Sequence, residues 1–348
     1  MKDLIHVAYC FDQNYEQHAA VSIFSLLNNS KIKKIFLHLV SYKLTNNFKN
    51  FLNDMKEKFD FHYKFYDFEQ QRLLSLKKTL HEYVSIFENT RLFLPELIKN
   101  DTSRVIYLDS DTIILDDISD LYYLNLDSNY IAQAPDYSSD MMMNKISVSA
   151  YFNSGVILFD VSKWINEKIT EKLLSYESQN KDRIYFGPQC LLSLFFENKI
   201  LKLEKKYNYF ILSGSCQKLV DSFEAKIIHF IRDIKPWHKY FDNENMHHYQ
   251  FNLLKTIYRE SKPKEPKNLL EWKHYANYLF KKKDFKTSLQ IFKNILLWLK
   301  TIEPDNINQI SRLEFQGEIF LSQSKEIETL DLYRKFFDVK FGPSDYQA

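Results

Sequence analysis

The sequence predicts an α/β fold with a mainly parallel, three-layer sheet, followed by an all-helical C-terminal appendage. Short apolar runs alternate with amphipathic segments over the first hundred residues, and this alternation is typical of parallel sheets. No convincing strand pattern occurs after about residue 255. The 348 residues, 45% of them apolar, suffice for a large core and for about two domains. We therefore expect one domain at 1–255 and a helical domain at 256–348.

The expected strands and helices alternate in chain order. Apolar runs predict buried strands at 5–9, 35–40, 61–66 and 104–108. Apolar residues three and four positions apart predict helices at 17–27, 48–59 and 90–98. Ligands of such sheets bind beyond the carboxyl ends of the strands, so polar residues that follow a strand are the first candidates for a site.

The C-terminal part begins with a linker at 261–267, which is rich in Pro and Lys. After it, residues at the spacings of a tetratricopeptide-like helical hairpin are Trp272, Tyr275, Ala276, Leu279, Ser288 and Phe292. A weaker copy comprises Leu313, Gln316, Gly317, Phe320, Thr329 and Tyr333. Lysines interleaved with aromatic residues here favour a solvated helix face over an aromatic core, and contact with an anionic membrane is a second alternative. A protein-binding helical hairpin is the third alternative.

Composition excludes several classes of function. Lys and Arg exceed Asp and Glu by only two, and no nucleic-acid-binding module is recognisable, so we expect no nucleic-acid partner. Five dispersed glycines cannot form a glycine-rich phosphate loop. Three cysteines without C-x-x-C spacing favour a reducing cytosol, and no apolar run reaches the ~18 residues of a membrane span. The expected location is the cytoplasm, with the inner face of the plasma membrane as the alternative.

The strongest local signal is the hydrophobic run 105–108, which ends in two carboxylates, Asp109 and Asp111. Two acids at the carboxyl end of a strand can chelate a hard divalent cation, which in turn can hold a diphosphate. Carboxylates this close repel each other unless a cation neutralises them. The alternative is a plain acidic turn, which Asp116 and Asp117 nearby would favour.

Further segments occur in a characteristic order around this pair. They are Phe11-Asp12-Gln13-Asn14-Tyr15, Thr90-Arg91-Leu92, Tyr107-Leu108-Asp109-Ser110-Asp111, Tyr151-Phe152-Asn153-Ser154-Gly155-Val156, Ser162-Lys163-Trp164, Gln189, and His229 with Lys235-Pro236-Trp237-His238. Together they span residues 5–238 and resemble the family-8 retaining glycosyltransferases. That family has a GT-A fold and uses nucleotide-sugar donors with manganese.

The resemblance implies a role for each matching residue. Asp109, Asp111 and His229 would ligate Mn²⁺ or Mg²⁺, and oxygen ligands with one imidazole suit Mn²⁺ better than Ca²⁺. The residues that would bind the UDP part of the donor are Asp12, Asn14, Tyr15, Arg91, Ser110 and Lys235. Those that would line the sugar and serve catalysis are Asn153, Gln189 and, on the acceptor side, Asp136.

By this resemblance the protein is a metal-dependent retaining glycosyltransferase. It would move a hexose, galactose or glucose, from a UDP-sugar to a hydroxyl of a glycan, glycolipid or glycoprotein, in bacterial lipopolysaccharide or other surface-glycan synthesis. In such enzymes the departing phosphate is thought to help deprotonate the incoming hydroxyl.

The chain departs from the family at Pro188 and Cys190, where relatives carry acids on both sides of the glutamine. Proline offers no side-chain acceptor for a sugar hydroxyl. Either Asp182 or Asp160 replaces the missing acid, or the donor is another UDP-sugar such as an N-acetylhexosamine, or activity is reduced. Slow hydrolysis of the donor and a nucleotide-sugar-binding scaffold are the remaining alternatives. The donor sugar, acceptor, linkage and oligomeric state stay open at this point.

Overall fold

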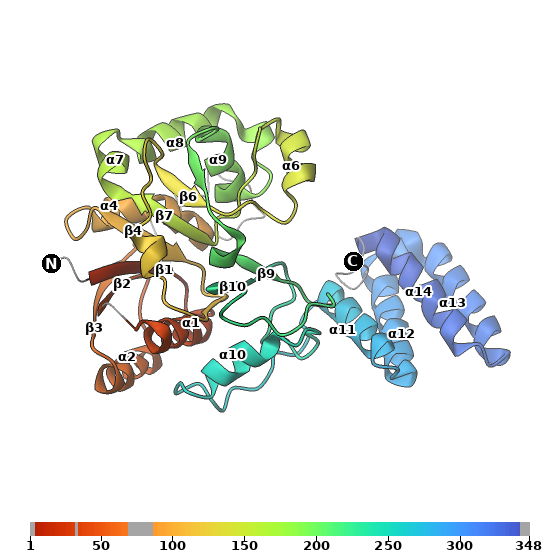
Figure 1. Cartoon of the computed structure of the whole chain (residues 1–348). Helices are drawn as coiled ribbons and strands as arrows, with labels where there is room; N and C mark the ends of the chain where they lie inside the picture. The colour runs from red at the N-terminus through yellow and green to blue at the C-terminus, as the bar shows by residue number, and fades with distance from the viewer. Residues whose placement is uncertain (1–3, 32–33, 69–85, 342–348) are drawn as a thin grey trace. The chain divides into compact units, whose positions relative to one another are not determined.

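The computed structural model describes residues 4–31, 34–68 and 86–341 (Figure 1). By their contacts, residues 1–210, 220–230 and 250–260 form one compact unit. A second unit comprises 211–219, 231–249 and 261–348. The predicted division into a domain at 1–255 and a helical domain at 256–348 stays a prediction.

A mainly parallel sheet forms the centre of the first unit. Its strands are β1 (Leu4–Cys10), β2 (Lys34–Ser41), β3 (Phe61–Asp67), β4 (Arg104–Leu108), β6 (Ile131–Gln133), β7 (Val156–Asp160) and β8 (Ile200–Lys202). Within the described ranges they have the order β3-β2-β1-β4-β7-β6-β8. Strand β7 runs antiparallel to β4 and β6, whereas the other pairs are parallel. The predicted fold class is confirmed.

Helices cover both faces of this sheet, because successive side chains of a strand point to opposite faces. On one face Ile5, Val7 and Tyr9 of β1 share a core with α1 (Glu16–Asn29) and α2 (Asn46–Lys58). On the other face Ala8 joins a second core. The helices that complete this core are α4 (Leu94–Ile98), α7 (Val161–Asn166), α8 (Ile169–Gln179) and α9 (Gly187–Phe195).

The predicted helix at 90–98 is divided into two shorter elements. A 3-10 helix, η1 (Ile86–Leu92), precedes α4, and Pro95 lies in the first turn of α4. Proline lacks the N–H that a continuing helix would need, but it suits a helix start. The break places Arg91 in the last turn of η1.

A small second sheet completes the architecture around the end of β4. Its strands are β5 (Thr112–Ile114), β9 (Tyr209–Ile211) and β10 (Ile227–Phe230), in the order β5-β10-β9. Strand β10 pairs antiparallel with β5, and His229 lies opposite Thr112. The remaining elements before the C-terminal helices are α5 (Ser119–Tyr122), α6 (Ser139–Ile146), η2 (Lys181–Arg183), η3 (Lys205–Tyr207) and α10 (Met246–Leu253).

Helical hairpins make up most of the second unit. Their helices are α11 (Leu269–Lys281), α12 (Phe285–Ile302), α13 (Ile307–Ser322) and α14 (Glu326–Phe341), with the short η4 (Pro304–Asn306) between the hairpins. The Ser288 hydroxyl donates to the carbonyl of Ala276 at 2.8 Å, and Thr329 donates likewise to Gly317 at 3.3 Å. The two hairpins therefore repeat one packing contact at the positions that the spacing predicts. None of the described helices is both long and apolar enough to cross a membrane.

Candidate functional site

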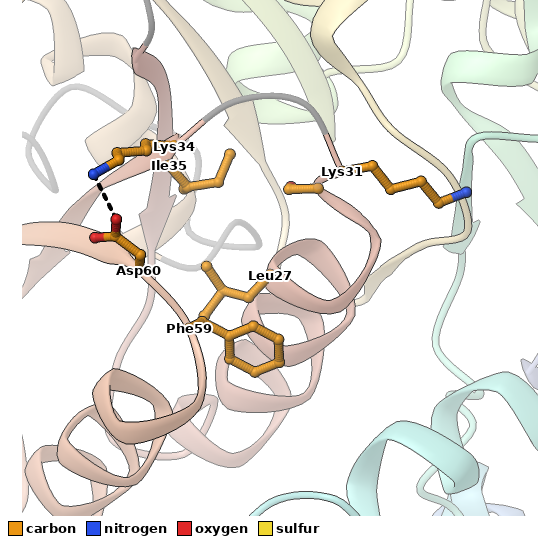
Figure 2. Close-up of a pocket in the computed structure, with 7 residues that line it drawn as sticks. Leu27, Lys31, Lys34, Ile35, Phe59 and Asp60 are labelled. Carbon is orange, nitrogen blue, oxygen red and sulfur yellow. Dashed lines mark ion pairs between the residues drawn. The ribbon is translucent and has the colours of Figure 1, made fainter.

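A hollow of about 260 Å³ lies beside the amino ends of β2 and β3 (Figure 2). An ion pair of 2.5 Å between Lys34 and Asp60 borders it, and apolar side chains of Leu27, Ile35 and Phe59 line it. Ligands of α/β sheets bind at the opposite, carboxyl edge of the strands. We assign no function to this hollow.

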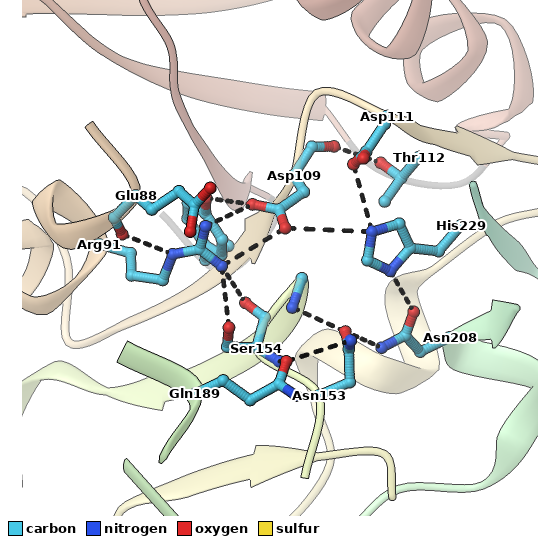
Figure 3. Close-up of polar contacts among 12 residues, drawn as sticks. Glu88, Arg91, Asp109, Asp111, Thr112, Asn153, Ser154, Gln189, Asn208 and His229 are labelled. Atoms are coloured by element: carbon cyan, nitrogen blue, oxygen red, sulfur yellow. Dashed lines mark hydrogen bonds and ion pairs between the residues drawn. The ribbon is translucent and has the colours of Figure 1, made fainter. Parts of the chain in front are cut away.

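At the carboxyl end of β4, three side chains from distant parts of the sequence converge (Figure 3). Asp109 and Asp111 follow the last residue of β4, and β10 brings His229 beside them. Nε2 of His229 lies 3.2 Å from Oδ1 of Asp111 and 4.0 Å from Oδ2 of Asp109. One ligand atom from each residue lies within 4.8 Å of the others. Two carboxylates and an imidazole at these separations are a suitable donor set for a divalent cation such as Mn²⁺.

Arg91 holds the first of the two carboxylates. Its guanidinium forms an ion pair of 3.0 Å with Asp109 and donates to the carbonyl oxygen of Ser154 at 2.6 Å. The Tyr107 hydroxyl donates to the same carboxylate, and the guanidinium lies over the Tyr107 ring at 4.8 Å. Burial opposes the charge of Arg91, but Asp109 and Tyr107 outweigh it and the pKa of Arg91 is raised. Arg91 and Tyr107 thus hold the Asp109 carboxylate in place.

The predicted sugar-side residues also meet. The Asn153 amide donates to Asp136 at 3.1 Å and to Gln189 Oε1 at 3.3 Å. The Gln189 amide donates to the same Asp136 oxygen at 3.0 Å, while its Oε1 accepts the backbone N–H of Ser154 at 3.2 Å. Gln189 lies in the first turn of α9, which begins at Gly187 with a φ of 44°. A positive φ is accessible to glycine without strain, so Gly187 allows the sharp entry into α9.

The predicted nucleotide-binding residues occupy the turn after β1 and the acidic pair itself. The Asp12 carboxylate accepts the backbone N–H groups of Asn14 and Tyr15 at 2.9 and 3.2 Å, which shapes the turn. Burial, followed by the carboxylates of Asp111 and Glu88, raises the pKa of the Tyr15 phenol. Oγ of Ser110 is buried and has no hydrogen-bond partner within the described ranges, so it is available to a ligand.

The sequence also singled out Lys235, Asp160 and Asp182. Lys235 belongs to the second unit, where its backbone N–H donates to His238 at 3.1 Å, and its contact with phosphate stays a prediction. Asp160 caps α7 and pairs in the sheet with Arg104, at the opposite end of β4 from Asp109. It therefore cannot replace the acid missing at Pro188. Asp182 is exposed in η2, and its proposed replacement role is untested.

Sequence reasoning missed Asn208, a buried residue that contacts both parts of the site. Its Oδ1 lies 3.0 Å from Nδ1 of His229, and its Nδ2 donates to Oδ1 of Asn153 at 2.9 Å. These partners lie 21 and 55 residues away in the chain. The residue follows the short turn η3, and no local pattern in the sequence distinguishes it from an ordinary turn asparagine.

Comparisons with known proteins agree with this geometry. The model of glycosyl transferase family 8 matches residues 6–240. The chain is 27% identical over 292 residues to lipopolysaccharide 1,2-glucosyltransferase of Escherichia coli K12, covering 80% of this chain and 86% of that protein. It is 25% identical over 278 residues to general stress protein A of Bacillus subtilis, covering 73% and 96%.

Among solved structures, galactosyltransferase LgtC in complex with donor and acceptor sugar analogues matches with a TM-score of 0.62. The match covers 73% of this chain and 96% of LgtC at 19% identity, so it shows a shared fold. The family model spans every segment on which the resemblance rests, including Asp109, Asp111, His229 and Gln189. The chain therefore belongs to glycosyl transferase family 8 and is a glycosyltransferase with a GT-A fold.

Proposed function

We propose that this glycosyltransferase is metal-dependent and retaining, and that it moves a galactose or glucose residue from a UDP-sugar to a glycan hydroxyl. The observation that carries the proposal is the convergence of Asp109, Asp111 and His229 within 4.8 Å. Arg91 pairs with Asp109 at 3.0 Å, and carboxylates as close as Asp109 and Asp111 repel each other unless a cation lies among them. The relatives named as lipopolysaccharide 1,2-glucosyltransferases support an acceptor in lipopolysaccharide or another surface glycan.

The ion-binding half of the site, which comprises Asp109, Asp111 and His229, would hold the diphosphate. Mn²⁺ or Mg²⁺, when bound by Asp109, Asp111 and His229, would neutralise charge on the departing UDP. Ser110, whose hydroxyl is buried between the two acids, would bind the nucleotide. Asp12, Asn14 and Tyr15 lie in one turn and would bind uracil and ribose. Arg91 contacts Asp109 and Ser154, so it would act on the donor through Asp109.

The sugar-binding half of the site, which comprises Asp136, Asn153 and Gln189, would orient the anomeric carbon of the donor sugar. The bond from the anomeric carbon to the diphosphate oxygen breaks, and a bond to the acceptor oxygen forms on the same face. The acceptor proton passes to the departing phosphate oxygen. Gln189 cannot serve as the carboxylate nucleophile of a retaining glycosidase, because a carboxamide is too weakly nucleophilic. Its oxygen accepts the Ser154 N–H and an Asn153 N–H, which would hold it beneath the sugar.

Asp136 would provide the carboxylate that Pro188 lacks. One Asp136 oxygen accepts hydrogen bonds from the side-chain amides of Asn153 and Gln189. This acid therefore lies directly against the proposed sugar site. The other family acid is replaced by Cys190, which is buried with its sulfur 3.4 Å from the Tyr151 hydroxyl. Asp136 would therefore meet a hydroxyl of the donor or of the acceptor. Galactose and glucose are the first donors to test, and N-acetylhexosamines are the comparison.

The acceptor would be a glycan, a glycolipid or a glycoprotein, reached in the cytoplasm or at the inner face of the plasma membrane. The lysines of the helical part give little support to a membrane surface, since Lys281 and Lys282 both pair with Asp242 at 2.9 and 2.8 Å. Paired charges attract anionic lipid less than unpaired ones. A protein-bound or soluble glycan acceptor does not need such a surface.

The proposal is tested by thermal unfolding and by product formation. Mn²⁺ together with the correct UDP-sugar is expected to raise the melting temperature, because a ligand that binds the native state stabilises it. UDP release should then require both the ion and a glycan acceptor. Asp109→Asn is expected to abolish transfer, whereas Asp116→Asn, which alters an acid paired with Lys31, should leave it unchanged. No thermal shift with any UDP-sugar would contradict the donor site, and UDP release without an acceptor would indicate hydrolysis.

A further inference from the structure

We propose that Asn208 is a positioning residue that sets the tautomer of His229 and links the ion-binding half of the site to the sugar-binding half. The inference rests on the proposed function, since it assigns work to a neighbour of the proposed metal ligand. Asn208 is 1% exposed, and its side chain lies between His229 and Asn153. Figure 3 shows this bridge.

The turn that carries Asn208 is firmly held. The backbone N–H of Asn208 donates to the carbonyl of Lys205 at 3.0 Å, which closes η3. The hydroxyl of Tyr207 donates to Asp120 at 2.8 Å and anchors the turn to α5. A side chain on such a turn can fix the orientation of its partners, because its own position is determined by the surrounding fold.

The orientation of the Asn208 side-chain amide follows from a backbone N–H group. The N–H of Gly155 donates to Oδ1 of Asn153 at 2.9 Å, and a backbone N–H can only donate. Asn153 therefore presents its oxygen to Asn208, and Asn208 must offer its own Nδ2 there. This leaves Oδ1 of Asn208 toward His229, where an amide oxygen can only accept.

The proton of neutral His229 is consequently assigned to Nδ1. The lone pair on Nε2 then points toward the carboxylates, 3.2 Å from Asp111 and 4.0 Å from Asp109. A histidine that ligates a metal needs this arrangement, in which one nitrogen donates to a fixed partner and the other keeps its lone pair. Asn208 thus selects the tautomer that can bind a cation, and the same side chain positions Asn153.

Two variants separate these tasks. Asn208→Ala removes both hydrogen bonds and is expected to weaken Mn²⁺ binding, measured by calorimetry without nucleotide, by about 10–100-fold. Asn208→Asp keeps an acceptor for Nδ1 of His229, so Mn²⁺ binding should be retained. Its second oxygen faces Oδ1 of Asn153 and cannot donate, so the variant should lose the advantage of UDP-sugar over UDP in thermal stabilisation. Equal Mn²⁺ affinity of wild type and Asn208→Ala would overturn the proposal.

A matched control is Asn29→Ala, which removes an amide that donates to the carbonyls of Ser25 and Ile114 outside the site. Both alanine variants lose two hydrogen bonds, but only Asn208→Ala should change ion binding. If Asn29→Ala weakens Mn²⁺ binding equally, the effect of Asn208 is one of general stability and the proposal fails.

The tautomer itself is measurable without any ion. Nitrogen-15 chemical shifts of labelled histidine are expected to show a proton on Nδ1 of His229, where Asn208 accepts it. The signal is assigned by its absence in His229→Gln, and the opposite tautomer should become populated in Asn208→Ala. A wild-type protein in which Nδ1 of His229 carries no proton would overturn the inference. This measurement does not depend on Mn²⁺. If the protein binds no Mn²⁺, the proposed function is refuted, whereas the proton on Nδ1 of His229 still decides the inference.

Discussion

A methyl group on Gly155 would lie 2.2 Å from Cε1 of His229, so the imidazole occupies the space that any other residue at position 155 would fill. The same methyl group would lie 2.9 Å from Oδ2 of Asp109. The carbonyl of Gly155 also accepts the Asp109 N–H at 2.8 Å, and its N–H donates to Asn153. The glycine therefore allows the backbone just before β7 to contact both Asp109 and Asn153 at close range.

Gly155→Ala is expected to displace His229 and to weaken Mn²⁺ binding by at least about tenfold, because a metal ligand must keep its position to contribute. Calorimetric titration with Mn²⁺ measures the effect. The matched control is Gly317→Ala, where the new Cβ would lie 2.3 Å from the Tyr333 hydroxyl in the helical part. That variant should lower the free energy of unfolding by about 1–3 kcal/mol and leave Mn²⁺ binding intact. Wild-type affinity in Gly155→Ala would contradict the prediction.

The fold was largely predictable because its signals are local. Continuous apolar runs such as 105–108 mark strands buried on both faces, and their alternation with helices indicates a parallel sheet. The division of the helix predicted at 90–98 also has a local cause. Pro95 favours a helix start and disfavours a helix interior, so η1 and α4 form separately.

The site was predictable only where local pattern or family resemblance indicated a residue. Asp109 and Asp111 stand out because acids directly follow a buried strand. A histidine within the apolar strand β10 looks like a core residue, and only the resemblance singled out His229. Asn208 carries neither signal, since its importance depends on partners that the fold brings together from distant segments. Long-range hydrogen bonds of this kind leave no periodicity in a single sequence.

Arg91→Lys is expected to reduce transfer by at least about tenfold, although the charge is kept. A lysine cannot reproduce the fork that reaches both Asp109 and Ser154, so the first metal-binding carboxylate would lose its fixed orientation. The matched control is Arg104→Lys, since Arg104 donates to the carbonyls of Tyr122 and Leu124 and begins the strand at the other end from Asp109. Steady-state rates of UDP release compare the two variants, and equal rates would refute the role given to Arg91.

Asp338→Asn is expected to destabilise the helical part by about 3–5 kcal/mol. The side chain of Lys273 is fully buried and pairs with Asp338 at 2.8 Å, so the substitution leaves a buried ammonium without its counter-charge. Glu318→Gln is the control, because its pair with Lys293 is largely exposed and should contribute at most about 1 kcal/mol. Urea unfolding followed by circular dichroism measures the free energy of unfolding of both variants. Equal decreases in the two variants would contradict the prediction that the buried pair of Lys273 and Asp338 contributes more than the exposed one.

The acid sensitivity of the central sheet should depend on His38 of β2. This fully buried residue lies 2.9 Å from His6 and 2.7 Å from the Tyr66 hydroxyl. Burial, then the neighbouring His6, lowers the pKa of His38 from 6.5 to about 3, with Lys64 acting in the same direction and Asp101 opposing. The unfolded chain therefore binds a proton below about pH 6.5 that the folded chain does not bind until about pH 3. Stability is complete above this window and falls as pH decreases through it, by up to about 1.4 kcal/mol per pH unit.

Urea unfolding at several pH values between about 7.5 and 4.5 tests this dependence. His38→Gln removes the titrating group, so its free energy of unfolding should fall less steeply with decreasing pH than that of the wild type. The matched control is His62→Gln, a substitution of an exposed histidine on the neighbouring strand β3, which should keep the wild-type slope. Identical slopes in the wild type and in His38→Gln would place the acid sensitivity elsewhere, because a histidine that stays neutral in the folded state must contribute to the slope.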